Sequence, residues 1–322
     1  MFDGSVFKMD FEAELEKIAG LLRNTIIKQF RRKGAIVALS GGIDSSVCAA
    51  LCAKVLGPER VFGILLPESD SSSASESLGE TIAKHLKIQY VKQNITPTLE
   101  AIGCYQWRDE AIRTLFPDYD ASWKNKIVIS QNLFESSKLN FFKLVVQSPD
   151  GEVREKRLSL NAYLQIVAAT NFKQRIRKTI EYFHADRLNY AVIGTPNRLE
   201  YDQGFFVKNG DGSADVKPIA HLYKTQVYAM AEYLGVPEKI RQQRPTTDTY
   251  SLTQSQDEFY FVLPYEQMDL ALYAHINDVP AEEAAPVIGI TAEQVERVYQ
   301  DIERKRETTR YLHTPPVKIE VE

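Results

Sequence analysis

Short apolar runs alternate with helical patterns through the first part of the chain. Runs rich in branched apolar side chains predict buried strands at Ile36–Leu39, Val61–Leu66, Ile88–Val91 and Tyr190–Ile193. Apolar residues at helical spacing predict helices at Phe11–Phe30, Leu78–Leu86 and Tyr163–Tyr182. Because strands alternate with helices, we expect the α/β class, with a doubly wound parallel sheet that has helices on both faces.

The segment Gly103–Arg157 interrupts this alternation. Two β-like runs, Phe141–Gln147 and Glu152–Leu158, flank Ser148-Pro149-Asp150-Gly151, which is a hairpin signal. The preceding stretch, Pro117–Lys126, shows no regular pattern. We interpret residues 103–157 as an insertion within a single domain that spans residues 1–322, and we expect it to cover a site or to form a subunit contact.

The remainder of the chain predicts mainly helices. An amphipathic pattern at Tyr223–Leu234 ends at Gly235. A helical C-terminal region follows, with patterns at Pro264–Ile276, Ala281–Ile288 and Thr291–Lys305. We expect a polar loop at Pro245–Glu258, a serine-rich loop at Glu68–Ser77 and an extended tail at Arg310–Glu322.

Composition is that of an ordinary globular protein. Of the 322 residues, 44% are hydrophobic and 25% are charged, so the chain can bury a sizeable core. The net charge of −4 argues against general binding of nucleic acid. The 3 cysteines show no metal or disulfide pattern, which favours a reducing compartment. No run resembles a signal peptide or a membrane span, so we predict a cytoplasmic protein that binds neither nucleic acid nor membranes.

A phosphate-binding loop is the first candidate site. Ser40-Gly41-Gly42 follows the first predicted strand directly, and a helical pattern begins at Ile43. The first amide N–H groups of a helix lack internal partners and carry the positive end of its dipole, which suits phosphate. Hydroxyl donors are added by Ser40, Ser45 and Ser46. Asp44 would repel phosphate unless a cation lay between them, so it indicates Mg²⁺. A tight turn with Asp44 as an ordinary first-turn residue is the simpler alternative.

A second candidate site follows the strand at Tyr190–Ile193 and so belongs at the same edge of the sheet. The stretch Gly194–Asp215 is denser in Asn, Glu, Lys and Asp than a glycine-rich surface turn requires. Glu200 is placed to share a cation with Asp44. Two further polar residues, Lys208 and Asp211, flank glycines in a loop that a ligand can approach.

Three basic residues on predicted helices are further candidates. Lys224 lies in the first turn of its helix, where it opposes the helix dipole and therefore indicates an anionic partner. Arg175 and Arg177 are two residues apart and point about 200° from each other, so they cannot serve one ligand equally. One of them could bind a carboxylate or phosphate, or both could belong to a solvated basic face.

Several separated motifs carry a family resemblance. The string SGGIDSS at Ser40–Ser46 resembles the pyrophosphate loop of the ATP pyrophosphatases, which split ATP into AMP and pyrophosphate. With TNFKQRIR at Thr170–Arg177, the pattern of Gly194–Asp215 and KPIAHLYKTQV at Lys217–Val227, the chain resembles the NAD synthetase family. The resemblance runs from about Phe11 to the C-terminus and omits the insertion. It implies that Mg-ATP adenylates the nicotinate carboxylate of deamido-NAD and that ammonia then displaces AMP.

By matching position, the resemblance implies roles for individual residues. Contacts to ATP would come from Ser40, Gly41, Gly42, Ile43, Asp44, Ser45, Ser46, Thr195, Lys224 and Thr246. Contacts to deamido-NAD would come from Arg175, Lys208 and Asp215, which favours Arg175 over Arg177. Asp44 and Glu200 would hold Mg²⁺. In catalysis, Lys224 and the Mg²⁺ held by Asp44 would neutralise charge on the departing pyrophosphate, and Asp211 would take a proton from the incoming nitrogen.

The chain departs from the family pattern near its C-terminus. The family has a His-Lys-Arg run before its last prolines, and the matching stretch here, Thr309–His313, lacks the lysine. Arg310 lies at the matching place and could bind the acceptor instead. Val207 stands where the family has a hydroxyl residue. The main alternative is therefore a related AMP-forming amide ligase that acts on a different carboxylate. A non-catalytic nucleotide-binding subunit and a tRNA-modifying pyrophosphatase are two others.

The resemblance also implies partners. Glutamine-using relatives carry an extra glutaminase domain, but only about 30 residues precede the first predicted strand here. We therefore expect free ammonia or a separate glutaminase as the nitrogen source. We also expect a homodimer.

Overall fold

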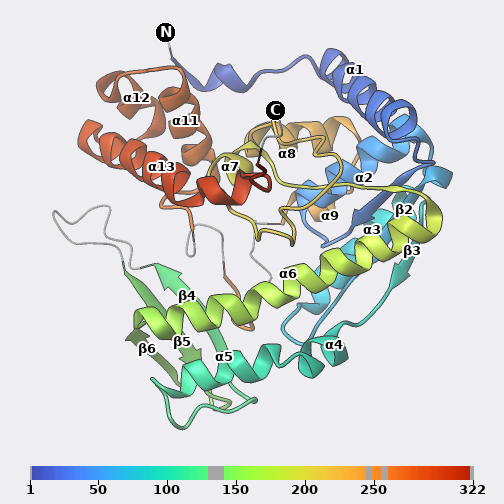
Figure 1. Ribbon diagram of the computed structural model, residues 1–322. Coiled ribbons are helices and arrows are strands. Elements are labelled where there is room, and N and C mark those ends of the chain that lie inside the picture. Colours follow the sequence, from blue (N-terminus) through green and yellow to red (C-terminus); the bar gives the residue numbers. More distant parts are fainter. Residues whose placement is uncertain (1, 130–140, 244–248, 255–259, 320–322) are drawn as a thin grey trace.

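The computed structural model describes residues 2–129, 141–243, 249–254 and 260–319 (Figure 1). Its strands are β1 Ala35–Ala38, β2 Val61–Leu65, β3 Gln89–Lys92, β4 Lys124–Ile129, β5 Phe142–Gln147, β6 Val153–Arg157 and β7 Ala191–Val192. Its α-helices are α1 Phe11–Leu22, α2 Ile43–Leu56, α3 Ser73–His85, α4 Thr96–Ala101, α5 Cys104–Arg113, α6 Leu160–Leu188, α7 Arg198–Asp202, α8 Lys224–Tyr233, α9 Glu238–Arg241, α11 Tyr265–Ile276, α12 Ala281–Ile288 and α13 Ala292–His313. A π-helical segment, η2 Arg23–Gln29, continues α1, and short 3₁₀ turns lie at η1 Gly4–Phe7 and η3 Pro58–Arg60. Within these ranges, no helix is both long enough and apolar enough to cross a bilayer.

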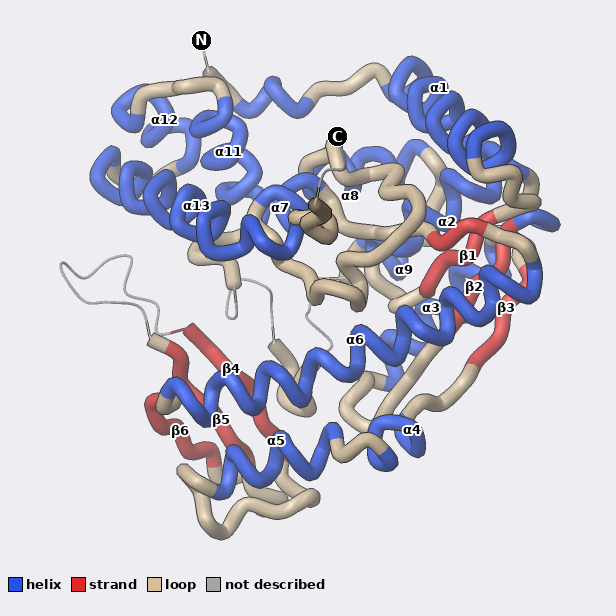
Figure 2. Tube along the Cα trace, viewed as in Figure 1, coloured by secondary structure: helices blue, strands red, loops and turns tan. Residues whose placement is uncertain are grey.

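The main sheet is parallel and has the strand order β3-β2-β1-β7. Ala35 of the inner strand β1 pairs with Val61 of β2 on one side and with Ala191 of β7 on the other. Side chains alternate between the two faces. Val37 joins a core with α1, α2, α3 and α8, whereas Ile36 joins a core with α4 and α6. Figure 2 shows helices on both sides of these strands, and the predicted doubly wound sheet is confirmed.

Helix α6 links the main sheet to the insertion. Its 29 residues span about 43 Å. Ser159 caps its beginning by accepting a hydrogen bond from the amide of Ala162, and Asn189 ends it in the left-handed conformation at φ 56°. Ala185, near its end, packs on the main sheet, whereas Ile166, near its beginning, packs in the core of the insertion. Figure 1 shows α6 crossing the molecule from one of these regions to the other.

The insertion contains a second sheet. Its strands β4, β5 and β6 are antiparallel and adjacent in that order. The predicted hairpin is confirmed, because Gln147 of β5 pairs with Val153 of β6. The strand β4 was not predicted. It begins within the stretch Pro117–Lys126, where the sequence shows no regular pattern because residues such as Lys124–Lys126 are polar. Pairing of Lys124 with Gln147 supplies the partner strand that makes it regular.

The C-terminal helices α11, α12 and α13 share a core that also includes Phe2 from the beginning of the chain. The predicted extended tail from Arg310 is wrong at its start, because α13 continues to His313. Between Ala292 and Pro315 the sequence has no proline or glycine that would end the helix earlier. Gly204 lets the last turns of α13 lie close to the end of α7, since a Cβ there would overlap the side chain of Thr309.

The serine-rich loop after β2 is shorter than the predicted Glu68–Ser77. Helix α3 begins at Ser73, because the hydroxyl of Ser72 accepts a hydrogen bond from the amide of Ser75. The loop after β2 therefore lies close to the beginning of a helix on one side and to the strand end on the other.

Candidate active site

The loop between β1 and α2 has the conformation that phosphate binding requires. Gly41 has φ +80°, and a Cβ there would overlap the backbone carbonyl oxygen of Ser75. Gly42 caps α2 without any side-chain hydrogen bond, so the first turn of the helix keeps its amide donors for a ligand. The hydroxyls of Ser40 and Ser45 lie 3.1 Å apart beside it. Ser46 is fully buried and donates to the carbonyl oxygen of Gly42 at 2.8 Å, so it supports the loop from within.

Two carboxylates from distant parts of the chain converge on one buried ammonium. Lys224 Nζ forms an ion pair with Asp44 and lies 3.8 Å from Glu200 Oε1, and Lys224 is only 2% exposed. Asn197 contacts both carboxylates: its Nδ2 donates to Asp44 Oδ1 at 3.0 Å, and its backbone amide donates to Glu200 Oε2 at 3.3 Å. Burial works to lower the pKa of Lys224, but Asp44 and Glu200 together raise it above its usual value. The lysine is therefore charged. The sequence predicts an anionic partner for it, and in this structure that partner is the pair of carboxylates.

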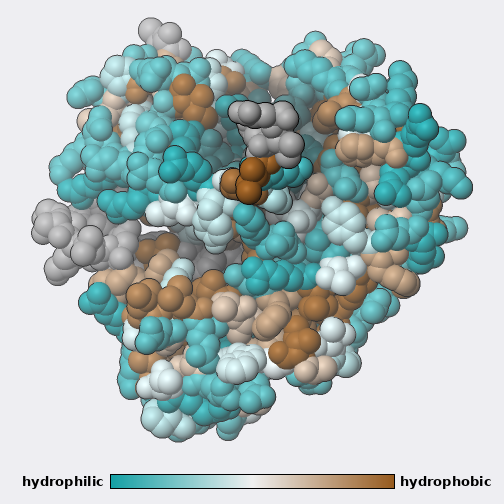
Figure 3. Space-filling model, in the orientation of Figure 1, coloured by the Kyte–Doolittle hydropathy of each residue, from teal (hydrophilic) through white to brown (hydrophobic). Residues whose placement is uncertain are grey.

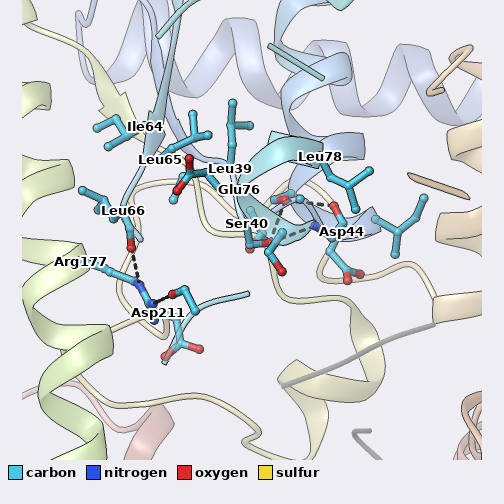
Figure 4. Close-up of a pocket in the computed structure, with 18 of the residues that line it drawn as sticks. Leu39, Ser40, Asp44, Ile64, Leu65, Leu66, Glu76, Leu78, Arg177 and Asp211 are labelled. Carbon is cyan, nitrogen blue, oxygen red and sulfur yellow. Dashed lines mark hydrogen bonds between the residues drawn. The ribbon is translucent and has the colours of Figure 1, made fainter. Parts of the chain in front are cut away.

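These groups line one pocket of about 360 Å³ (Figure 4). It opens at the carboxyl ends of β1, β2 and β7, where ligands bind in open α/β sheets. Ten of the candidate residues named from the sequence line this pocket: Ser40, Gly41, Gly42, Ile43, Asp44, Ser45, Thr195, Glu200, Asp211 and Lys224. Thr246 lies outside the described residues. The prediction that the two candidate sites share one edge of the sheet is confirmed.

The pocket also has a charged wall, of which the sequence analysis named only Arg177. Four residues of α6 line it, and they recur at helical spacing: Gln174, Arg177, Lys178 and Glu181. Lys178 and Glu181 form a buried ion pair at 2.6 Å. Arg177 is thus the arginine that faces the pocket, and Figure 4 shows it beside Asp211. The polar spacing was visible in the sequence, but the direction of this face depends on how α6 packs.

Asp211 accepts a hydrogen bond from the amide of Val207 at 2.8 Å and lines the same pocket. Burial raises the pKa of Asp211 above its usual value. A carboxylate with a raised pKa is a stronger base than an exposed one, so this residue is suited to accept a proton.

The four residues predicted to bind the acceptor lie outside the described lining of this pocket. Arg175 Nε donates to the carbonyl oxygen of Lys208 at 3.3 Å. Lys208 Nζ in turn donates to the carbonyl oxygens of Tyr311 at 2.7 Å and Thr314 at 3.2 Å, next to Arg310 at the end of α13. Asp215 instead accepts from the amide of Val192 at 2.7 Å. The structure therefore brings Arg175, Lys208 and the turn of Arg310 together and keeps Asp215 at the end of β7.

The carboxylates of Asp44 and Glu200 are the candidate ligands for a divalent cation. The described residues hold no group of three His, Cys, Asp or Glu side chains suited to a metal. Mg²⁺ commonly takes one or two carboxylates and completes its shell with phosphate oxygens and water. Asp44 and Glu200 lie on one ammonium at the mouth of a phosphate-binding loop, so these two carboxylates fit such an ion.

A parallel sheet with a glycine-serine loop, an acidic pair and a buried lysine at one edge defines an α/β protein of the ATP pyrophosphatase class. The family model described as NAD synthase matches residues 14–116 and 116–311, and the chain belongs to this family. A relative from Mesorhizobium japonicum, named NH(3)-dependent NAD(+) synthetase, is 55% identical over 309 residues, which are 96% of this chain and 97% of the relative. A relative of the same name from Rhizobium meliloti is 52% identical over 320 residues, 99% of this chain and 95% of the relative.

Solved structures show the same fold. The NH3-dependent NAD synthetase from Campylobacter jejuni aligns with a TM-score of 0.62 at 22% identity, over 97% of this chain and 100% of that one. The NMN synthetase from Francisella tularensis aligns with a TM-score of 0.66 at 20% identity, over 98% of this chain and 100% of that one. At these identities the likeness concerns the fold alone.

Proposed function

We propose that this chain is an ammonia-dependent NAD synthetase. It adenylates the nicotinate carboxylate of deamido-NAD with Mg-ATP and amidates the product with ammonia to give NAD⁺, AMP and pyrophosphate. One observation supports this most directly: Asp44, Glu200 and Lys224 meet the glycine-serine loop in a single pocket. The names of relatives that are 52–55% identical over nearly the whole chain support the same assignment.

The first step is assigned to the pocket at the sheet edge. The triphosphate lies on the amides of the loop Ser40–Ser45, with Lys224 beside it. An oxygen of the acceptor carboxylate attacks the α-phosphorus, and the bond to the β-phosphate oxygen breaks, so pyrophosphate leaves. Asp44 and Glu200 would hold Mg²⁺, which when bound supplies positive charge to the leaving pyrophosphate. No protein nucleophile takes part, and burial raises the pKa of Cys48 and Cys52 above the usual range.

In the second step, the nitrogen of ammonia attacks the carboxyl carbon of the adenylate. The bond from that carbon to the AMP oxygen breaks, and one proton leaves the nitrogen. We assign the proton to Asp211, whose carboxylate lines the pocket and whose pKa is raised by burial. Free ammonia is the proposed nitrogen source, and a separate glutaminase is the alternative supply.

The acceptor is assigned to Arg175, Lys208 and the turn of Arg310, with Asp215 at the end of β7 as a further candidate contact. Cations at this place suit the phosphates and carboxylate of deamido-NAD. The second candidate, an AMP-forming amide ligase for another carboxylate, is kept because the C-terminal turn lacks the lysine of the family pattern. The two candidates share every step at the ATP pocket and differ only in this cluster.

One assay separates them. The purified chain is given ATP, Mg²⁺, ammonium and deamido-NAD, and AMP, pyrophosphate and NAD⁺ are measured together. We expect the three products in equal amounts and no product when glutamine replaces ammonium. ADP and orthophosphate would contradict the family chemistry. Parallel reactions with nicotinate mononucleotide and other carboxylates test the second candidate, which replaces the first if only they are amidated.

The quaternary structure and compartment are part of the proposal. Two side chains one turn apart at the beginning of α6, Leu160 and Leu164, are 70% and 53% exposed. Figure 3 shows apolar side chains gathered along this part of the molecule. Burial of such a surface against a second copy favours association, so we propose a homodimer. The cytoplasm is the proposed compartment, consistent with three free, buried thiols.

A further inference from the structure

A buried cluster of charges joins the insertion to the loop after β2. In that loop, Asp70 accepts two hydrogen bonds at one oxygen, Oδ2, from Arg108 Nη1 at 2.6 Å and from Lys173 Nζ at 2.5 Å. Arg108 belongs to α5 in the insertion and Lys173 belongs to α6. The side chains of Asp70, Arg108 and Lys173 are 10%, 9% and 2% exposed. Water therefore screens these contacts far less than it screens a surface ion pair.

Glu68 extends the cluster toward the strand end. Its side chain is fully buried and lies 3.0 Å from Lys173 Nζ. It also accepts hydrogen bonds from the hydroxyl of Tyr105 at 2.7 Å and from the amide of Asp70 at 3.0 Å. Lys173 donates further to the carbonyl oxygen of Thr249 at 2.9 Å. Side chains from α5 and α6 thus hold two acidic residues of one short loop.

The guanidinium of Arg108 keeps its charge despite burial. Burial works to lower the pKa of Arg108, but Asp70, Tyr119 and Asp109 together raise it above its usual value, so the guanidinium stays charged. A buried ion cluster contributes little to stability compared with apolar residues of the same size. Its distinctive effect is to hold the loop in one conformation, because a planar guanidinium and a buried ammonium can both donate to the carboxylate in only a few positions.

The other side of the same loop lines the nucleotide pocket. Leu66, Pro67, Ser71 and Ser72 contribute to the pocket wall. From within the pocket, Arg177 donates to the carbonyl oxygen of Leu66 at 3.3 Å and to Ser71 Oγ at 3.4 Å (Figure 4). The hydroxyl of Ser71 also accepts from the amide of Glu68 at 3.2 Å. Movement of the acidic residues would therefore displace the part of the wall that faces ATP.

We propose that the insertion holds the loop of residues 66–72 in its ATP-binding conformation, and that Arg108 and Asp70 are positioning residues for the nucleotide. Neither side chain belongs to the described lining of the pocket, so both act through the loop. The inference rests on the assignment of this pocket to ATP and not on the identity of the acceptor.

The test is Arg108→Met, which removes one of the two cations on Asp70 and leaves Lys173 in place. We expect the Kd for ATP from calorimetry and the KM for ATP to rise on the order of tenfold, the effect of losing one charged hydrogen bond. The KM for the acceptor and kcat should stay within about twofold, because the reacting groups are unchanged. Arg108→Lys should recover part of the ATP affinity. Tyr105→Phe, which removes the hydroxyl that donates to Glu68 and leaves both cations on Asp70, should give a smaller rise.

A matched control lies in the same insertion. Arg154 of β6 pairs with Asp118 at 2.7 Å and lies over the ring of Trp123 at 4.6 Å, with no hydrogen bond or ion pair to the loop of residues 66–72 among the described residues. Arg154→Met should leave ATP binding unchanged. If it weakens ATP as much as Arg108→Met does, the insertion acts only through stability and the inference fails. Unchanged ATP affinity in Arg108→Met and Tyr105→Phe would also overturn it. If the wild type forms no NAD⁺ but ATP binding responds as expected, the proposed acceptor fails and this inference stands.

Discussion

Lys224 is the residue on which the charge balance of the nucleotide pocket depends. Its ammonium faces Asp44 and Glu200, and together the three side chains carry one net negative charge. A divalent cation on the two carboxylates would reverse that sign at the proposed triphosphate site. The lysine therefore keeps two carboxylates compatible with burial, and in the proposed function it becomes a phosphate partner once the nucleotide binds.

Asp44→Asn should abolish this arrangement with little change in shape. The amide oxygen can still accept from Asn197, but the charge that balances Lys224 and would hold Mg²⁺ is lost. We expect AMP formation to fall by a factor on the order of 100 or more. We also expect stability to fall by about 1–3 kcal/mol, because the buried lysine loses a partner. AMP release measures the loss of turnover, and thermal melting measures the loss of stability.

The control for this variant is Asp202→Asn. Asp202 is a carboxylate two residues after Glu200 whose partner is Arg306, at 2.8 Å, and it does not belong to the described lining of the pocket. Its loss should leave turnover intact. Wild-type turnover in Asp44→Asn would exclude Asp44 from the reaction.

At this scale the sequence predicted the loop and its partners well and the α6 wall poorly. Gly41, Asp44 and Lys224 sit at helix beginnings, where local rules of capping and dipole apply directly. For Arg177 and Glu181, no local sequence rule predicts whether the side chain faces a pocket or solvent. Only the packing of α6 across the strand ends gives their face its direction.

At the scale of elements, helix α8 begins over a buried carboxylate. Asp269 of α11 accepts hydrogen bonds from Thr225 at its amide, 2.7 Å, and at its hydroxyl, 2.8 Å. Burial raises the pKa of Asp269 to about 6. The contact joins the C-terminal helices to the helix that carries Lys224.

This raised pKa predicts a loss of stability as pH rises. An aspartate in the unfolded chain has a pKa near 3.9, so between about pH 4 and 6 the folded state holds more protons than the unfolded state. The free energy of unfolding should therefore fall by about 2–3 kcal/mol across that window and stay lower above it. In Asp269→Asn the neutral amide removes this contribution. Urea unfolding of both proteins at pH 4.5 and 7.5 measures it.

The comparison across pH is internally controlled. Any packing cost of the asparagine is present at both pH values and cancels. The variant should gain stability relative to the wild type on going to the higher pH. A difference in free energy that is the same at both pH values would show that Asp269 does not titrate in this range.

Elements with strong local patterns were predicted, and elements made by pairing were not. Strands β1 and β2 are apolar throughout, and the predicted bounds are within a residue of the observed ones. β4 begins with polar residues and becomes regular only through its ladder with β5. The last turn of α13 was missed because the four residues before it, Arg306–Thr309, are polar and interrupt the apolar pattern, and Gly204, more than 100 residues away, gives Thr309 room.

At the scale of the whole molecule, the proposed homodimer can be tested directly. Replacing Leu160 and Leu164 together by Glu puts two charges into the proposed contact, where each would be desolvated. We expect the wild type to behave as a dimer in size-exclusion chromatography with light scattering and the double variant as a monomer. Leu21→Glu, at an exposed apolar position on α1, should remain dimeric. A monomeric wild type at micromolar concentration would contradict the proposal.

The position of β1 in the main sheet bears on how the protein is made. β1 can pair with β2 soon after both are synthesised, but its other neighbour, β7, lies roughly 150 residues further along the chain. At ribosomal rates of about 5–20 residues per second, β7 is synthesised roughly 8–30 s after β1. The sheet face that carries Ile36 stays uncovered for about as long, because it packs against the end of α6. A nascent chain at this stage exposes an unpaired strand edge and an apolar face, the two features that recruit chaperones or lead to aggregation.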